Sequence, residues 1–198
     1  MSEKSGMSRR HFLSVATSVT GTAGVVMAAV PFVMSFKPNA RAQALGAPVQ
    51  VDISKLEEGA MVRVMWRGKP VWVLRRSREM LQRMADSNPD LADPNSEVAD
   101  QQPPYAQNED RSIKSEILVV LGVCTHLGCA PIERFDIAPA DLGPDWVGGF
   151  YCPCHGSKFD LSGRVYAGFP APTNLPVPPH RYIGENLILV GDDTGAGT

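Results

Sequence analysis

The sequence lacks an excess of charge of either sign. It has 19 lysine and arginine residues against 21 aspartate and glutamate residues, a formal net charge of −2. We therefore do not expect a nucleic-acid-binding surface. Cysteine is also scarce, with four residues in a chain of 198. Four cysteines do not suggest a disulfide scaffold at this length; they indicate one site.

Charge is absent altogether from residues 12–36, an uninterrupted run of 25 residues. A helix of this length is about 37 Å long and crosses a hydrocarbon core of about 30 Å, so the run predicts a transmembrane helix. The preceding Ser8-Arg9-Arg10-His11-Phe12-Leu13 is typical of a twin-arginine export signal. The two arginines place the amino terminus in the cytoplasm by the positive-inside rule, and hence the rest of the chain in the periplasm.

A cleaved signal peptide is the alternative, because residues 40–44 offer A-x-A cleavage sites. The span exceeds the usual apolar region of about 7–15 residues, which favours retention. Small residues at 20–24 would let a retained helix pack closely against a partner helix. We predict four segments: a cytoplasmic segment 1–11, a transmembrane anchor 12–36, a hinge linker 37–48 and a periplasmic domain 49–198.

The linker 37–48 consists mainly of small residues. As a flexible coil its twelve residues would reach about 20 Å and would let the domain swing while the anchor stays fixed. A passive stalk and a continuation of the helix remain open, because alanine is a good helix former.

Strand patterns dominate the sequence after residue 48. They predict strands at 49–53, at 61–66 and 71–74 (a hairpin with its turn around Gly68-Lys69), at 117–121, 150–151 and 186–190, and a hairpin over 158–166. A short helix is predicted to begin at an N-cap, Ser77. Residues 85–110 hold seven acidic residues, four prolines and no lysine or arginine, which predicts a solvated surface insertion without chemistry. We expect an all-β head, an antiparallel sandwich interrupted by a small metal-binding subdomain at about 122–178.

Possible metal ligands gather in two boxes, Cys124-Thr-His126-Leu-Gly-Cys129 and Cys152-Pro-Cys154-His155-Gly-Ser157, which hold all four cysteines and two of the four histidines. Cys-x-His plus Cys-x2-His supplies two thiolates and two imidazoles, a set that suits a tetrahedral zinc or an iron–sulfur cluster. Cys129 and Cys154 are left over, one beside each pair, and a disulfide between them would clip the two loops together. His11 and His180 have no such cysteine neighbour and are interpreted as surface or core residues.

The two boxes resemble those of the Rieske [2Fe–2S] protein of cytochrome bc1 complexes. Residues 168–175, Gly-Phe-Pro-Ala-Pro-Thr-Asn-Leu, are similar to the proline-rich loop of that family. With the export motif and the apolar span, the resemblance covers nearly the whole chain. It implies the Rieske fold and one [2Fe–2S] cluster, with Cys124 and Cys152 on the inner iron and His126 and His155 on the outer iron.

Imidazole ligation raises the potential of such a cluster from about −400 mV to between roughly −150 and +300 mV, so that it can accept an electron from a quinol. The ring nitrogen that does not bind iron can carry a proton, which couples proton to electron transfer. The resemblance implies that His155 accepts a hydrogen bond from quinol, although the sequence does not choose between His155 and His126. Ser157 is either a turn residue or a donor to a cluster sulfide. Phe159 stands where mitochondrial relatives have a tyrosine that bonds a ligand sulfur.

The resemblance also implies the setting: the iron–sulfur subunit of quinol–cytochrome c reductase, a proton-translocating oxidoreductase, beside cytochrome b and cytochrome c1 in a dimeric complex of the bacterial inner membrane. Its exposed tip would dock on cytochrome b through Leu127, Gly128, Pro170 and Pro172. One rival is the Rieske small subunit of a periplasmic molybdenum oxidase similar to arsenite oxidase, which also uses twin-arginine export. A membrane-tethered zinc-binding module is the rival from another class, and metal analysis separates it.

Overall fold

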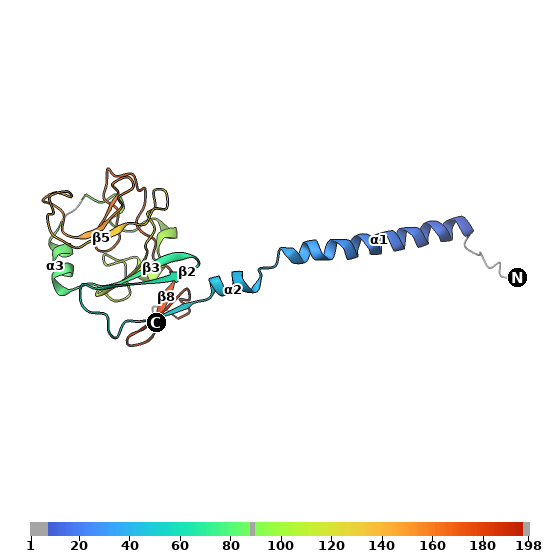
Figure 1. Cartoon of the computed structure of the whole chain (residues 1–198), viewed down its shortest axis with the longest axis horizontal. Helices are drawn as coiled ribbons and strands as arrows, with labels where there is room; N and C mark the ends of the chain where they lie inside the picture. The colour runs from blue at the N-terminus through green and yellow to red at the C-terminus, as the bar shows by residue number, and fades with distance from the viewer. Residues whose placement is uncertain (1–7, 88–89, 196–198) are drawn as a thin grey trace. The chain divides into compact units, whose positions relative to one another are not determined.

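The computed structural model describes residues 8–87 and 90–195, and the chain divides into two compact units, Met1–Ala44 and Leu45–Thr198 (Figure 1). Residues 1–7 of the predicted cytoplasmic segment lie outside the described residues.

The first unit is mainly the helix α1, Arg9–Ser35, whose N-cap Ser8 accepts a hydrogen bond from the His11 N–H. It has no buried residue, and it is long and apolar enough to cross a membrane, a property that an amino-terminal signal sequence shares. A second helix, α2, covers Ala40–Gly46, so the coil expected for the linker is wrong over these residues. The helix-forming alanines explain the difference, together with the Asn39 side chain, which accepts the Ala42 N–H at 2.8 Å.

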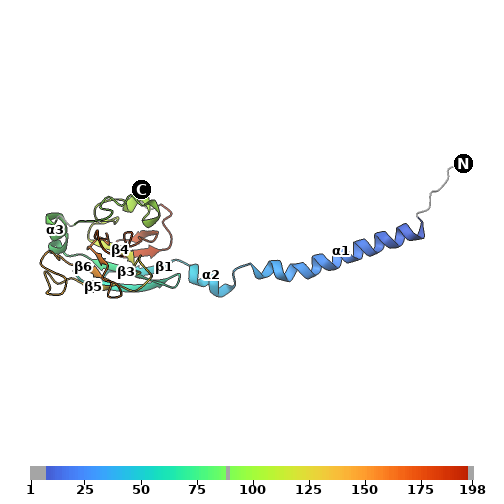
Figure 2. The same ribbon diagram turned by 90° about the horizontal axis from the view of Figure 1, so that it is seen from above.

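The described residues of the head form three antiparallel three-stranded sheets, which agrees with the predicted all-β class. Their strands, in sheet order, are β1 (Val49–Asp52), β9 (Leu187–Val190) and β8 (His180–Gly184); β2 (Met61–Trp66), β3 (Lys69–Arg75) and β4 (Ile117–Leu121); and β5 (Ile132–Arg134), β6 (Gly149–Tyr151) and β7 (Lys158–Phe159). The helix α3 covers Arg78–Asp86, and two 3₁₀ turns follow at Ala99–Gln101 and Pro104–Ala106. Figure 2 shows α3 beside the strands.

The sheet β2-β3-β4 forms the middle layer, and β5 and β8 lie on opposite sides of it in Figure 1. Residues 71–74 of its strand β3 form a continuous apolar run because both faces are buried there. Val71 and Val73 pack with residues of β1 and β9 in one core, whereas Trp72 and Leu74 pack in a second core. The second core also contains Cys124 and Cys152, so the middle sheet forms the floor of the predicted metal-binding subdomain.

Two local predictions can be compared with the structure directly. The β2-β3 hairpin turns at Arg67-Gly68, since Trp66 pairs with Lys69, and not around Gly68-Lys69 as predicted. Both turn residues have positive φ, 49° and 72°, as a type I′ hairpin turn requires. The predicted N-cap of α3 is confirmed, because the Ser77 hydroxyl accepts the Met80 N–H.

The acidic segment 85–110 is not merely a solvated insertion, and that prediction is wrong in part. Ser96 and Ala106 are fully buried. The Ala92 N–H donates to the Val165 carbonyl at 3.0 Å, and the Gln101 carbonyl accepts the Val177 N–H at 2.7 Å. The amino-acid composition reflects the exposed side chains of the segment. It cannot indicate these hydrogen bonds, because they are made by the backbone. The segment supports the chain on both sides of the proline-rich loop.

Candidate metal centre

The two boxes fold into loops with the same backbone pattern. In the first, the Cys124 N–H donates to the Cys129 carbonyl at 2.8 Å, and the Gly128 N–H returns to the Cys124 carbonyl at 3.0 Å. In the second, the Cys152 N–H donates to the Ser157 carbonyl at 2.8 Å, and the Gly156 N–H donates to the Cys152 carbonyl at 2.9 Å. The fifth residue of each loop is a glycine with φ near 80°. A glycine is needed there because other residues are strained in this conformation.

The matched loops bring the Cys124 thiol to the Cys152 thiol and the His126 ring to the His155 ring. Cys124 and Cys152 are free cysteines, 2 % and 1 % exposed. The rings of His126 and His155 meet edge to face, with their centroids 4.7 Å apart. His126 is half-buried and His155 is exposed, so the two thiols are more deeply buried than the two imidazoles. Burial raises the pKa of the Cys152 thiol, and the neighbouring Cys124 thiol acts in the same direction.

This donor set fits a [2Fe–2S] cluster with mixed ligation. The Nδ1 atom of His126 is buried and has no hydrogen-bond partner among the described residues. A buried polar atom without a partner costs about 1–3 kcal/mol, and a bond to a metal would remove that cost. The sulfur atoms of Cys129, Cys152 and Cys154 also lie within 4.8 Å of one another. Two of these sulfurs are bonded together, however, so they do not form a separate thiolate site.

The predicted disulfide between Cys129 and Cys154 is present. Each cysteine belongs to one box, and the bond closes a sequence separation of 25 residues. The two loops that carry the candidate ligands are therefore joined covalently, next to both ligand pairs.

Hydroxyl groups hold the proline-rich loop to both boxes. The Ser157 side chain is fully buried, and its oxygen accepts the Ala171 N–H at 3.1 Å. Its own hydrogen has no acceptor among the hydrogen bonds of the described residues, so it is available to a sulfide at the centre. From the first box, the Thr125 hydroxyl donates to the Thr173 carbonyl at 2.7 Å. Sequence reasoning missed Thr125; its position between two candidate ligands was the available signal.

Comparison with known proteins decides the family. The family described as the Rieske [2Fe-2S] domain matches residues 48–179, and one described as a "Ubiquitinol-cytochrome C reductase Fe-S subunit TAT signal" matches residues 1–39. The chain belongs to the Rieske family. The zinc alternative is therefore set aside, and the cofactor is a [2Fe–2S] cluster.

Relatives named as iron–sulfur or Rieske subunits match over nearly the whole chain. The "Ubiquinol-cytochrome c reductase iron-sulfur subunit" of Allochromatium vinosum is 58% identical over 95% of this chain and 90% of its own length. The protein of the same name from Blastochloris viridis is 43% identical over 96% of both chains. The mitochondrial "Cytochrome b-c1 complex subunit Rieske" of Chlorocebus aethiops is 37% identical over 96% of this chain and 63% of its own length.

The residues that the Rieske resemblance assigned to docking are all exposed. Leu127 is 72% exposed, an unusual degree for a large apolar side chain, and Gly128 follows it at the same loop tip. Pro170 and Pro172 are exposed in the proline-rich loop, on either side of the buried Ala171. Exposed apolar groups suit a docking surface when they lie on loops that a disulfide and hydrogen bonds hold in place.

Proposed function

We propose that this chain is the electron-transfer subunit of a quinol–cytochrome c reductase. Cys124 and Cys152 would hold the inner iron of the cluster, and His126 and His155 the outer iron. The observation that carries this proposal is the edge-to-face pair of imidazole rings, 4.7 Å apart, beside two buried free thiols. The names of the relatives point to the same reaction.

The bound cluster supplies a one-electron acceptor whose potential is raised by its imidazole ligands. The protein supplies the path for the proton. His155 is the more exposed ring, which favours it over His126 as the group that meets quinol. Its nitrogen that does not bind iron accepts the hydrogen bond of a quinol hydroxyl and takes the proton. His126 is half-buried, and its buried Nδ1 supports that atom as the iron ligand.

The partners that we propose are cytochrome b, which provides the quinol site, and cytochrome c1, which receives the electron, in a dimeric complex. The exposed side chain of Leu127 and the exposed prolines Pro170 and Pro172 would dock on cytochrome b. The name of the mitochondrial relative, a subunit of a cytochrome b-c1 complex, supports this setting.

We propose further that residues 12–36 remain as a single-pass anchor in the bacterial inner membrane. The amino terminus would be cytoplasmic and the domain 49–198 periplasmic, and the match to an export-signal family supports export. The linker 37–48, with α2 inside it, would let the domain move between its two partners.

Purification of the intact protein from membranes tests the function. We expect b-type and c-type haem to accompany it, with non-haem iron and acid-labile sulfide in equal amounts. Molybdenum in place of haem would assign the chain to an oxidase similar to arsenite oxidase. Zinc without sulfide would remove the cluster from the proposal altogether.

The hydrogen-bond donors around the centre should adjust its potential. Ser157→Ala removes a buried hydroxyl whose hydrogen is free to bond a sulfide, and the reduced cluster, being more negative, loses more from this than the oxidised cluster. A bond of about 1.5 kcal/mol felt only by the reduced state equals about 65 mV for one electron. Since the oxidised state feels part of it, we expect protein-film voltammetry to show a decrease of tens of millivolts.

The converse variant is Phe159→Tyr, which supplies the phenol donor that mitochondrial relatives have. Phe159 is fully buried in β7, two residues after Ser157, so the ring is fixed by packing. We expect the potential to rise by a similar amount. An unchanged or lower potential, in protein that keeps its cluster, would mean that this ring does not face a ligand sulfur.

A further inference from the structure

Two arginines are buried in the head without an acidic partner. Arg76 is 1% exposed and Arg111 is not exposed at all. Neither takes part in a salt bridge within the described part of the chain. Burial of an unpaired charge is costly, and arginine is almost never fully buried unless it is paired. The arrangement therefore needs an explanation.

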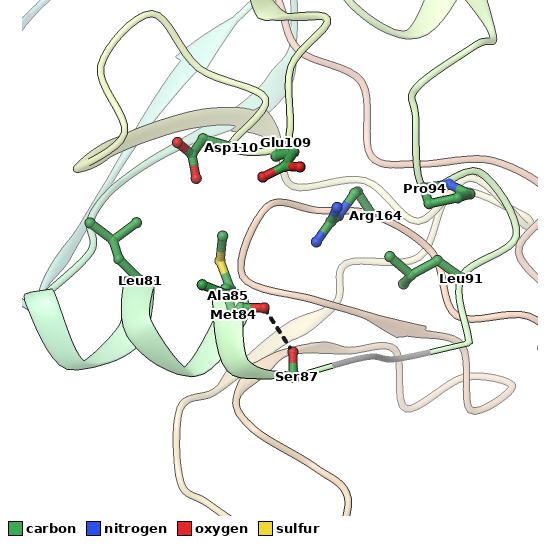
Figure 3. Close-up of a pocket in the computed structure, with 9 residues that line it drawn as sticks. All are labelled: Leu81, Met84, Ala85, Ser87, Leu91, Pro94, Glu109, Asp110 and Arg164. Atoms are coloured by element: carbon green, nitrogen blue, oxygen red, sulfur yellow. Dashed lines mark hydrogen bonds between the residues drawn. The ribbon is translucent and has the colours of Figure 1, made fainter.

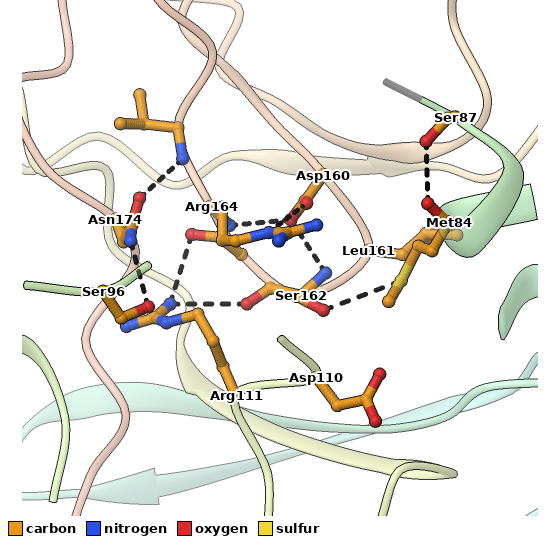
Figure 4. Close-up of polar contacts among 12 residues, drawn as sticks. Met84, Ser87, Ser96, Asp110, Arg111, Asp160, Leu161, Ser162, Arg164 and Asn174 are labelled. Carbon is orange, nitrogen blue, oxygen red and sulfur yellow. Dashed lines mark hydrogen bonds and ion pairs between the residues drawn. The ribbon is translucent and has the colours of Figure 1, made fainter. Parts of the chain in front are cut away.

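Arg111 is held by uncharged acceptors from three segments. Its Nη1 donates to the Leu175 carbonyl at 2.7 Å and to the Ser162 and Gly163 carbonyls at 3.3 Å. Figure 4 shows the contact between Arg111 and Ser162. The Arg111 Nη2 donates to the Gln102 side chain at 3.0 Å. The backbone at Arg111 is left-handed, with φ of 50°, an uncommon conformation for a residue other than glycine. The acceptors of the Arg111 Nη groups are uncharged and leave the positive charge uncompensated, and its buried Nε has no hydrogen-bond partner in the described part of the chain.

Arg76 is held in the same way. Its Nη1 donates to the Asp110 carbonyl and the Ser162 hydroxyl, both at 3.0 Å, and its Nη2 to the Ser112 hydroxyl at 2.7 Å. Burial lowers the pKa of each of the two arginines to about 10, which is still well above neutral pH. Both guanidinium groups are therefore charged under physiological conditions.

The acidic groups nearby do not cancel this charge. Asp160 is buried, but its carboxylate accepts the Arg164 Nε at 2.7 Å and is already paired. Asp110 lines an open pocket of about 230 Å³ together with Arg164, as Figure 3 shows. Asp93 is likewise only partly buried, and water screens carboxylates in such positions. The buried Asp160 carboxylate is thus neutralised by Arg164, and the two buried guanidiniums of Arg76 and Arg111 leave an excess of two positive charges.

This positive group shares its core with the ligand cysteines. Leu175, whose carbonyl binds Arg111, and Leu161, whose carbonyl accepts a hydrogen bond from Arg76, pack in the same core as Cys124 and Cys152. Thr173, two residues before Leu175, is bonded to Thr125 beside Cys124. The region between the guanidiniums and the centre is thus packed protein, where charges interact more strongly than in water.

We propose that the guanidinium groups of Arg76 and Arg111 raise the reduction potential of the centre electrostatically. They are positioning residues that never touch the cluster, and the inference rests on the proposed ligand set. Two ferric ions, two sulfides and two thiolates sum to zero charge, and one added electron makes the centre negative. A buried positive charge therefore stabilises the reduced state and leaves the neutral oxidised state almost unaffected. A neutral hydrogen-bond donor in place of either arginine would lack this effect.

Voltammetry of the full-length protein with its cluster tests the inference. Arg111→Gln and Arg76→Gln should each lower the potential, and the shift should persist at high salt because buried charges are poorly screened. Arg111→Lys keeps the positive charge, so the potential of this variant should stay near that of the parent protein. The matched control is Arg63→Gln, since Arg63 is an exposed arginine that is paired with Glu133. Its potential should not move.

Asp160→Asn gives the opposite sign, since it removes the negative charge of the group and keeps an oxygen for the Ser162 and Arg164 N–H groups. The potential should rise, and this variant decides the matter if the glutamine variants fail to fold. The inference would be overturned if the glutamine variants had the same potential as the control. It would also be overturned if the potential of Arg111→Lys fell as far as that of Arg111→Gln, or if Asp160→Asn left the potential unchanged. Parent protein without a Rieske EPR signal would overturn the proposed ligand set itself.

Discussion

Protein carrying His155→Ala is expected to contain no [2Fe–2S] cluster, and His126→Ala should give the same result. Each change leaves the outer iron with one protein ligand, and alanine offers no atom to replace it. Iron and acid-labile sulfide should fall to background, and the reduced protein should show no Rieske EPR signal. This is the largest effect that we expect from a single substitution in the head.

Leu127→Ala is the matched control for this experiment. Leu127 follows His126 directly and is 72% exposed, but it has no atom that could bind iron. Its loss should leave iron, sulfide and the EPR signal unchanged, while weakening any docking that the tip provides. A full Rieske signal in His155→Ala protein would mean that another donor binds the outer iron, and the proposed ligand set would be wrong.

The ligand residues could be predicted from the sequence because their chemistry is local. Two or three positions separate the members of each pair, Cys124 with His126 and Cys152 with His155. The glycine that follows each pair indicates a turn. The buried strand β4 was equally readable, as a run of five apolar residues. In both cases the residues that form the sequence pattern are the same residues that form the structural feature.

What the sequence could not reveal depends on contacts between distant residues. The strands β5 and β8 escaped prediction because β5 has only three residues and β8 mixes buried with exposed positions. Arg111 looked like an ordinary charged residue at the end of an acidic segment, yet it binds a carbonyl 64 positions away. Nothing in its neighbourhood along the chain records that partner. The burial of Ser96 and Gln102 in the same segment was hidden for the same reason.

Removal of the disulfide should have the second-largest effect. A cross-link that closes a separation of 25 residues stabilises the folded state by about 3.5 kcal/mol, mainly because it limits the unfolded chain. We expect the double variant Cys129→Ala/Cys154→Ala to unfold at lower denaturant concentration and to lose its visible absorbance faster on warming. Loss of absorbance is the more direct measure, because the bond joins the two loops that hold the cluster.

The double variant is preferable to either single one. A single substitution leaves a thiol whose sulfur lies within 4.8 Å of the Cys152 sulfur, where it could compete for iron or form a new disulfide with a ligand. Alanine at both positions removes the cross-link without adding a donor, so faster cluster loss reports the missing constraint alone. If the double variant kept its cluster as long as the parent protein and unfolded at the same denaturant concentration, the paired backbone hydrogen bonds of Cys124 and Cys152 would be sufficient to hold the two loops. The disulfide would then have no part in retaining the centre.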